Sequence, residues 1–415
     1  METLSRREFA AVAAGFAAGA ARGQPPRPEA PTPVPARAVT RGPAHHFFGY
    51  YDKTPWDRTG RYLLVNQTGF ADRQPTAADV LTVGMVDLRD GDRFVELGRT
   101  PAWSWQQGTM LQWLGTPGGT EVVFNSLTDG RPSATILDTT GRRARTLPLP
   151  VYAVHPAGTE AVTLDFARLH RLRPGYGYAS YTERFADDPA PEQLGVWRMD
   201  LATGKHDLVI TLKQLAANRP DARFDGAHHW VNHLQYSQKG TRFAFLHRWK
   251  KPDDRTWQTR LYAANADGTG LRLVHDTGMV SHYDWRDETM ILAWARTADR
   301  GNRFYLLDAA GDRPPELVFP DVTQDGHCSY SPDRAWVLND TYPDKERNQH
   351  LMLLKVATGR RYTLNALHSP PRFTGPVRCD LHPRWDRTGT MVCVDGCHDP
   401  QRQVYVLDVA EVVRS

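Results

Sequence analysis

The sequence predicts an all-β fold, a single seven-bladed β-propeller. Two series of short strand segments recur along the chain, and each series has seven members. In the first, a tight turn precedes an apolar strand, as in residues 325–340, where Ser331-Pro332-Asp333 makes the turn. The second consists of apolar strands such as 304–308, several of them followed by a Thr-Gly or Gly-Asp turn. Four-stranded units at a period of roughly forty to fifty residues are typical of a propeller.

The two series alternate along the chain. The turns of the first series lie at 56–60, 115–119, 155–158, 237–240, 284–287, 331–333 and 385–389. The strands of the second series lie at 84–88, 134–138, 196–200, 261–265, 304–308, 351–355 and 404–408. A β-sandwich with accidental spacing is the rival, and the agreement of two independent series disfavours it. The long gap between Gly158 and Gly240 predicts an insertion.

The amino-terminal segments precede the repeats. Residues 1–21 carry Arg6-Arg7 and an apolar, Ala-rich run, which predicts a signal of the twin-arginine type. Residues 22–37 form a Pro/Ala-rich linker, and 38–415 form the propeller as one domain. Little chain is left after Asp408, so we expect the beginning of the folded chain to supply the outer strand of the last blade.

Charge and hydropathy exclude some partners. The net charge of +4 is too small to indicate nucleic-acid binding. No stretch after the signal could cross a bilayer, although an uncleaved signal anchor is an alternative. We therefore expect a monomeric periplasmic or secreted protein without membrane contact after signal cleavage.

The four cysteines all lie in the last quarter of the chain. They are Cys328, Cys379, Cys393 and Cys397. An oxidising compartment permits a disulfide, and Cys379 with Cys393 or Cys397 is the predicted pair. A thiolate metal ligand is the alternative.

Histidines cluster just before the turns, where inner strands line the central channel. His233, His282, His327 and His382 each precede a turn by about four to seven residues. Equivalent places on neighbouring blades face one another, so these imidazoles are predicted to hold a divalent metal, Zn or Mn. Hydrogen-bonded structural histidines between blades are the alternative.

The predicted insertion carries a cationic stretch at residues 166–178. It combines arginines, including Arg173, with Tyr176 and Tyr178 in a Gly/Pro-bent loop. Because guanidinium holds a carboxylate through paired hydrogen bonds, the loop predicts a carboxylate-binding rim. A solvated basic loop is the alternative.

Several of these stretches carry a family resemblance. The string His45-His46-Phe47-Phe48-Gly49-Tyr50-Tyr51-Asp52-Lys53 and further stretches resemble the ulvan lyase group of propeller polysaccharide lyases, and more distantly oligogalacturonate lyase. The further stretches are 173–178, 228–233, 281–285, 325–331, 339–343 and 378–385. The resemblance implies β-elimination on a uronic-acid-containing polysaccharide or oligosaccharide. That reaction needs a neutralised C6 carboxylate, a base for the C5 proton and an acid for the departing O4.

One position departs from the family. Ulvan lyases place a catalytic histidine on the returning strand of an early blade, and that strand here carries Asn125. An asparagine can hydrogen-bond a carboxylate but cannot serve as a base. We therefore expect Tyr178 as base or acid, His229 as its partner and Arg173 as the neutralising cation.

His46, Tyr51, Asn125 and Arg378 complete the site as predicted substrate contacts. Two other functions stay open at this point. A non-catalytic glycan-binding propeller would offer aromatic platforms without a base, and a metal-dependent hydrolase would need an open metal position for water.

Overall fold

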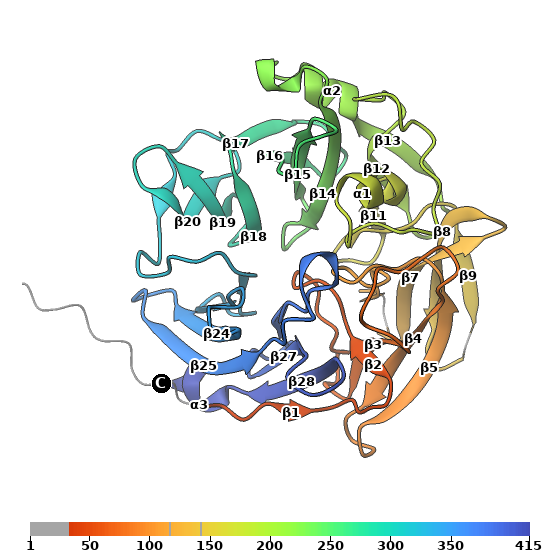
Figure 1. Ribbon diagram of the computed structural model, residues 1–415, viewed down its shortest axis with the longest axis vertical. Coiled ribbons are helices and arrows are strands. Elements are labelled where there is room, and N and C mark those ends of the chain that lie inside the picture. Colours follow the sequence, from red (N-terminus) through yellow and green to blue (C-terminus); the bar gives the residue numbers. More distant parts are fainter. Residues whose placement is uncertain (1–32, 116–117, 142) are drawn as a thin grey trace, which may run out of the picture.

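The computed structural model describes residues 33–115, 118–141 and 143–415, and they form the predicted seven-bladed β-propeller (Figure 1). Each blade is a four-stranded antiparallel sheet. The predicted signal and most of the predicted linker lie outside the described residues. In the described chain no helix has the length and apolar character needed to span a bilayer.

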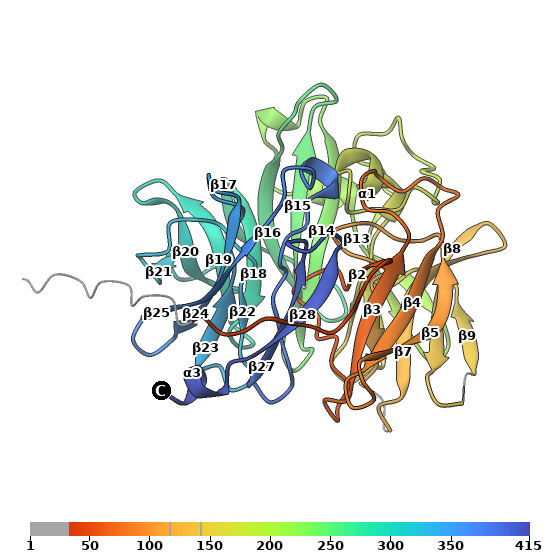
Figure 2. The ribbon, with the colours of Figure 1, turned by 60° about the horizontal axis from the view of Figure 1, so that its bottom comes forward.

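The strands follow the order expected from the repeats, and Figure 2 shows those of the first blade from β2 to β5. The first blade contains β2 (His45–Phe47), β3 (Tyr62–Thr68), β4 (Leu81–Asp87) and β5 (Arg93–Thr100). The second contains β6 (Gln112–Trp113), β7 (Glu121–Thr128), β8 (Arg131–Asp138) and β9 (Ala144–Leu147). The third contains β10 (Ala153–Val154), β11 (Glu160–Thr163), β12 (Gly195–Asp200) and β13 (His206–Thr211).

The remaining four blades complete the ring. The fourth contains β14 (His228–Tyr236), β15 (Arg242–Lys250), β16 (Gln258–Asn265) and β17 (Arg272–Gly278). The fifth contains β18 (Val280–Trp285), β19 (Met290–Thr297), β20 (Gly301–Asp308) and β21 (Glu316–Leu317). The sixth contains β22 (Ser329–Tyr330), β23 (Trp336–Asn339), β24 (Asn348–Lys355) and β25 (Arg361–His368). The seventh contains β26 (Arg384–Trp385), β27 (Met391–Gly396), β28 (Gln403–Asp408) and β1 (Arg37–Ala38).

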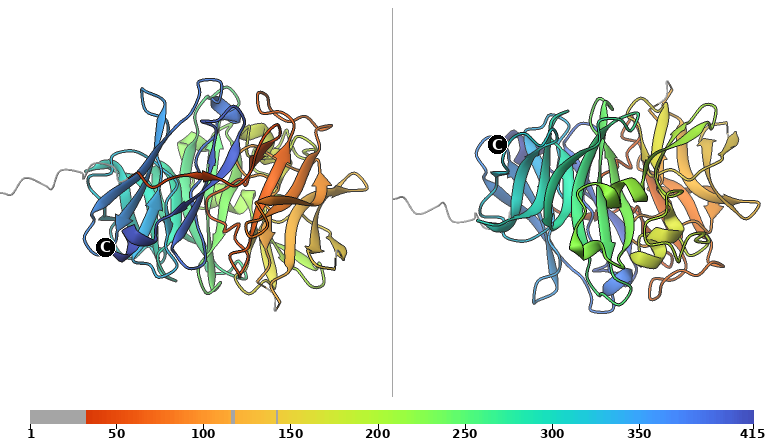
Figure 3. Two further views of the ribbon diagram at one scale, coloured as in Figure 1. Left: turned by 90° about the horizontal axis from the view of Figure 1, so that it is seen from below. Right: turned by 90° about the horizontal axis from the view of Figure 1, so that it is seen from above.

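The ring closes as predicted, because the outer strand of the last blade comes from the start of the folded chain. Arg37 and Ala38 of β1 pair with β28, and the N–H of Val39 donates to Val404 at 2.9 Å. Figure 3 (left) shows this red segment crossing the dark blue blade. The closure removes the free edge that an open sheet would leave at this point.

Tryptophans at the ends of inner strands tie neighbouring blades together. Three of them donate their indole N–H to a backbone carbonyl of the preceding blade. The pairs are Trp113 with Pro55 at 2.8 Å, Trp285 with Gln235 at 3.2 Å, and Trp385 with Ser329 at 3.3 Å. These large side chains fill the space between blades and satisfy their one polar group there.

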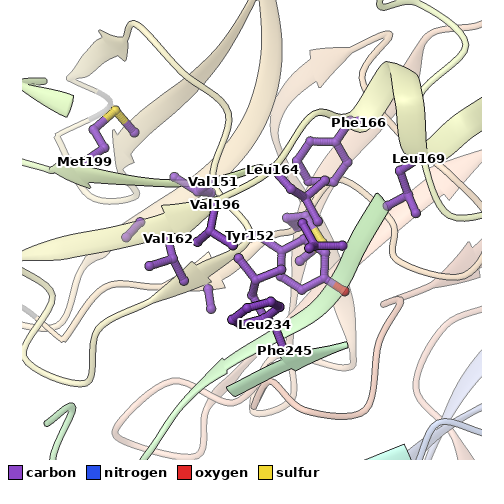
Figure 4. Close-up of a cluster of buried hydrophobic side chains, with 14 of the residues drawn as sticks. Val151, Tyr152, Val162, Leu164, Phe166, Leu169, Val196, Met199, Leu234 and Phe245 are labelled. Carbon is purple, nitrogen blue, oxygen red and sulfur yellow. The ribbon is translucent and has the colours of Figure 1, made fainter. Parts of the chain in front are cut away.

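The predicted insertion lies mainly between β11 and β12 and includes α1 (Phe166–Leu172). Asp165 caps this helix by accepting the N–H of Arg168 at 2.6 Å. Phe166 and Leu169 enter the hydrophobic cluster around Tyr152 (Figure 4). Arg168 is buried and donates to the carbonyls of Pro189 and His229, each at 2.7 Å, so this arginine of the cationic stretch anchors the insertion.

The other helices are short. They are α2 (Leu212–Ala217), α3 (Ala410–Arg414) and the 3₁₀ turns η1 (Ala222–Phe224) and η2 (Gly375–Val377). Helix α2 begins with a capping box in which Thr211 and Gln214 satisfy each other's backbone N–H groups.

All four cysteines are buried free thiols within residues 143–415, so the predicted disulfide is not formed there. Cys379 and Cys397 belong to one hydrophobic cluster, and the Cys397 thiol also lies 3.7 Å from the hydroxyl of Ser369. Cys393 lies elsewhere, 4.0 Å from Nη1 of Arg384.

A buried ion pair joins the last blade to the first. Arg384 Nη2 lies 2.8 Å from Asp395 Oδ2, and both side chains are almost fully buried. Arg384 also donates to the carbonyls of Gly49 and Tyr50, and Asp395 accepts the N–H groups of Phe48 and Gly49. The pair therefore fixes the backbone of residues 48–50 against the seventh blade.

We expect Asp395→Ala to lower the free energy of unfolding by about 3 to 5 kcal/mol, because it leaves the Arg384 charge buried without a partner. Thermal and urea unfolding measure the change. Asp90→Ala removes an exposed pair with Arg93 and should cost less than about 1 kcal/mol. If both variants lost the same free energy of unfolding, the Arg384–Asp395 pair would not join the blades as described.

Candidate functional site

The four histidines predicted as metal ligands converge at the centre of the ring. Ring centroids lie 4.1 Å apart for His282 and His327, 4.3 Å for His327 and His382, and 5.9 Å for His233 and His282. All four side chains are buried. We call these four residues the histidine cluster.

Local backbone features aim two of these side chains. The pairing of β14 with β15 shifts register between Asn232 and Gln235, and His233 within this bulge has a φ of 55°. His382 precedes β26 with a φ of 42°. Bulges and left-handed residues redirect side chains that regular alternation would place elsewhere.

His327, Asp380 and His382 form a group that could hold a metal ion. One ligand atom from each lies within 4.8 Å of the others. In the described chain the Nε2 atoms of His327 and His382 have no hydrogen-bond partner. His327 Nδ1 lies 2.9 Å from Asp340 Oδ1, which favours the tautomer whose Nε2 carries the lone pair. Unpartnered imidazole nitrogens beside a carboxylate fit a divalent ion such as Zn²⁺ or Mn²⁺.

Burial shifts the pKa values of several residues in and beside the candidate metal group. It lowers the pKa of His327 and His382 well below 6.5, which keeps both imidazoles in the neutral form that binds metals. It also raises the pKa of Asp340 to about 7. His282 Nδ1 lies 3.0 Å from Asp325 Oδ1. Two of the four histidines are therefore oriented by carboxylates.

Tyr50 and Tyr51 lie against the histidine cluster. The Tyr50 hydroxyl is 2.6 Å from His233 Nδ1. The Tyr51 hydroxyl donates to the backbone carbonyl of Tyr283 at 2.8 Å and accepts its N–H at 2.9 Å. Tyr51, predicted as a substrate contact, is fully committed to these bonds and forms the floor of the cluster.

Tyr176, a buried tyrosine between two arginines, also lies beside the cluster, with its ring 6.2 Å from those of Tyr50 and His233. Arg378 Nη2 donates to the Tyr176 hydroxyl at 2.7 Å, and Arg173 stacks over the Tyr176 ring at 4.1 Å. Arg378 Nε also donates to Asp380 Oδ2 at 2.6 Å, which links the tyrosine to the candidate metal group. Burial opposes ionisation of Tyr176, but the charges of Arg173 and Arg378 outweigh it and lower the pKa of the phenol below 10.

Arg248 is a buried cation that the motifs did not single out. It comes from β15, and its Nε and Nη1 have no hydrogen-bond partner within the part of the chain that the structure describes. Burial, followed by repulsion from Arg173, lowers its pKa to about 9. Both guanidinium groups contact the Trp257 ring, Arg173 at 4.3 Å and Arg248 at 5.6 Å from its centroid. The available signal was an arginine close to the apolar run 243–246 and directly before Trp249.

Tyr178 does not fit the predicted role of base or acid. Its ring stacks on Phe166 at 4.3 Å, and the side chain is wholly buried in the hydrophobic cluster around Tyr152. Its hydroxyl accepts from Asn125 Nδ2 at 3.0 Å, and burial raises the pKa of the phenol well above 10. Asn125 is likewise buried and bonds both backbone groups of Val151. Both residues support the fold, and neither faces the histidine cluster.

His229 and His46 also lie apart from the histidine cluster. His229 Nδ1 is 2.9 Å from His247 Nε2, and burial lowers the pKa of His229 to about 4. His46 hydrogen-bonds Gln403 at 3.0 Å and Gln67 at 2.9 Å. Of the residues predicted for catalysis and substrate contact, Arg173, Arg378 and Tyr51 therefore reach the centre of the ring.

Comparisons with known proteins match the fold. No protein-family model matches this sequence, and neither does any curated protein. A solved oligogalacturonate lyase in complex with manganese has a TM-score of 0.66 and 16% identity, over 94% of this chain and 96% of that chain. An oligogalacturonate lyase from Vibrio parahaemolyticus has a TM-score of 0.64 and 12% identity, over 91% and 94%.

A propeller of different function matches too. The tricorn protease has a TM-score of 0.50 and 11% identity, over 90% of this chain and 35% of that chain. At these identities the likeness establishes the propeller fold alone. The resemblance to the ulvan lyase group stays a prediction from sequence motifs.

We expect Tyr178→Phe to lower the free energy of unfolding by about 1 kcal/mol, because it removes one buried hydrogen bond from Asn125. Urea unfolding measures this change. The matched control is Tyr62→Phe, since the half-buried Tyr62 hydroxyl makes no hydrogen bond to the described residues. If both variants were as stable as the wild type, the structural role of Tyr178 would be wrong.

Proposed function

We propose that this protein is a metal-assisted lyase that cleaves a uronic-acid-containing oligosaccharide or polysaccharide by β-elimination. One observation carries the proposal: Tyr176 is held between Arg173 and Arg378, and Arg378 also binds Asp380 of the candidate metal group. The structural likeness to oligogalacturonate lyases, one of them in complex with manganese, supports it. Export through the predicted twin-arginine signal would bring the protein to such glycans.

Neutralisation of the substrate carboxylate is the first requirement of this reaction. Arg173 and Arg378 are half-buried at the solvent side of the cluster, and Arg248 offers free N–H donors behind them. Guanidinium groups pair with both oxygens of a carboxylate, which makes the C5 proton more acidic. A metal held by His327, His382 and Asp380, with His282 beside them, would supply further positive charge when bound.

Proton transfer is the second requirement. Tyr176 has a lowered pKa, so its phenolate form is accessible as the base for the C5 proton. As the C5–H bond breaks, the C4–C5 double bond forms and the C4–O4 bond breaks. The phenol formed on Tyr176 is then a proton donor for the departing O4. His233 lies near, with ring centroids 6.2 Å apart, and burial keeps it neutral.

We expect Tyr176→Phe to lower kcat/KM by about 10²- to 10⁴-fold, because it removes the proposed base. The measurement is the rise in ultraviolet absorbance of a 4,5-unsaturated uronate, with purified mature protein and a panel of uronate oligosaccharides and polysaccharides. Tyr178→Phe is the matched control and should retain most of the activity.

Other outcomes of this assay would favour the alternatives. Glycan binding without any absorbance rise would contradict the lyase and favour a non-catalytic glycan-binding propeller. New reducing ends without an absorbance rise would favour a metal-dependent hydrolase.

We expect chelation to abolish elimination and Mn²⁺ or Zn²⁺ to restore it, because the metal contributes to carboxylate neutralisation. Metal content after dialysis, measured by mass spectrometry, tests the ligands directly. His382→Ala should weaken metal binding by more than about tenfold, whereas His206→Ala, at an exposed histidine, should leave it unchanged. Equal metal content in the two variants would contradict the proposed ligand set.

A further inference from the structure

A large cavity lies in the channel next to the histidine cluster. It has a volume of about 460 Å³, and all seven blades line it with the ends of their inner strands. In four blades the lining residue follows a cluster histidine by two positions. The pairs are His233 and Gln235, His282 and Asp284, His327 and Ser329, and His382 and Arg384. Because each of these lining residues lies two positions after a cluster histidine, the cavity borders the histidine cluster and forms the next level of the channel.

Tyr51 separates the two levels. Its ring lies 5.3 Å from that of His327, and the same side chain lines the cavity. Both hydrogen bonds of its hydroxyl go to the backbone of Tyr283. The cavity is therefore distinct from the site proposed for elimination and is not used by that mechanism.

The charge of the cavity is unbalanced. Lys53 is neutralised by Asp52 at 2.8 Å, and Arg384 is neutralised by Asp395. The cations Arg58, Arg334 and Arg387 remain, and Asp284 is the other lining carboxylate. Arg334 lies 3.7 Å from that carboxylate.

Arg58 and Arg387 have no carboxylate within ion-pair distance among residues 33–115, 118–141 and 143–415. Each of the three guanidinium groups is anchored through a single N–H on a backbone carbonyl. These bonds join Arg58 to Gly115 at 2.9 Å, Arg334 to Trp285 at 3.1 Å, and Arg387 to Trp56 at 3.3 Å. The buried Nε of Arg334 has no partner in the described chain. Positioned guanidinium groups with free donors are suited to an anion.

The uncharged lining suits a polyhydroxylated ligand. Trp113, Trp285 and Trp385 line the cavity, as does Gln235, whose nitrogen donates to Asp284 and whose amide oxygen is available. The buried Ser329 hydroxyl has no partner in the described residues. Aromatic faces pack against sugar rings, while amides and hydroxyls exchange hydrogen bonds with sugar hydroxyls. The volume lies within the range of small-molecule sites, so it suits a ligand of one or two sugar units.

We infer that this cavity is a second ligand site, for a small sugar acid whose carboxylate is bound by Arg58, Arg334 and Arg387. The inference does not depend on elimination at the histidine cluster, because no residue of that mechanism lines the cavity. The cavity, at the ends of the inner strands and the turns that follow them, would then bind a ligand independently of the histidine cluster.

The test is the equilibrium binding of D-galacturonate to the full mature protein by titration calorimetry. Arg378→Ala removes a cation from the other level, and we expect galacturonate binding to persist in it. Adding Arg58→Ala and Arg387→Ala should weaken that binding roughly 10- to 100-fold, because charge-assisted hydrogen bonds are lost. Both arginines are exposed, so their replacement should leave thermal stability unchanged.

Arg93→Ala combined with Arg99→Ala, in the Arg378→Ala background, is the control for loss of charge, since both arginines are exposed on β5. It should bind like its parent. Absence of galacturonate binding in Arg378→Ala, or equal binding with and without Arg58 and Arg387, would overturn the inference. Inorganic phosphate binding as tightly as galacturonate would overturn the assignment to a sugar acid. Elimination activity unchanged by Arg58→Ala and Arg387→Ala would agree with two separate sites, whether or not Tyr176 is the base.

Discussion

The arrangement of seven inner strands around one axis is the constraint on which both levels of the channel depend. Seven strands run side by side around the axis, so residues at equal steps meet at one level. Imidazoles meet at one level, and amide, carboxylate, hydroxyl and guanidinium groups meet two residues further on. The ring must be closed for this, and the pairing of β1 with β28 closes it.

Arg378 links the proposed base to the candidate metal group at the level of the histidine cluster. One of its nitrogens holds the Tyr176 hydroxyl and another holds Asp380, so a phenol and a candidate metal ligand share one cation. Burying this many charges is costly unless each has a partner, and here the charges of Arg378 and Asp380 satisfy each other. Arg248 differs, because it is buried and its Nε and Nη1 have no hydrogen-bond partner among the described residues. Its burial without a carboxylate is understandable if an anionic ligand completes the site.

The repeats predicted the fold, the number of blades and the closure of the ring, because each follows from regular strand periods. They also predicted the convergence of four histidines from their equivalent places before the turns, although His233 and His382 reach the centre through left-handed backbone. The predicted site residues that do not reach the centre lie where the regular strand period is interrupted. Simple alternation places His229 and His233 on one face, but the bulge between Asn232 and Gln235 and the left-handed His233 separate them. In the insertion no period relates Tyr176 to Tyr178, and Gly175, with a φ of 94°, precedes the tyrosine that reaches the centre. Side-chain direction in such a loop depends on tertiary contacts, which cannot be inferred from the local sequence pattern.

The string from His45 to Lys53 has a physical explanation in this arrangement. Arg384 and Asp395 of the seventh blade hydrogen-bond the backbone of residues 48–50. The side chains of Tyr50 and Tyr51 then contact the histidine cluster. Gly49 is required there, because its φ is 127° and a Cβ would lie 2.8 Å from the backbone carbon of Gln107. Lys53 and Asp52 at the end of the same string form part of the wall of the cavity below. One short segment therefore holds the first and last blades together, forms the floor of one level of the channel and lines the next, which accounts for its density of aromatic and charged residues.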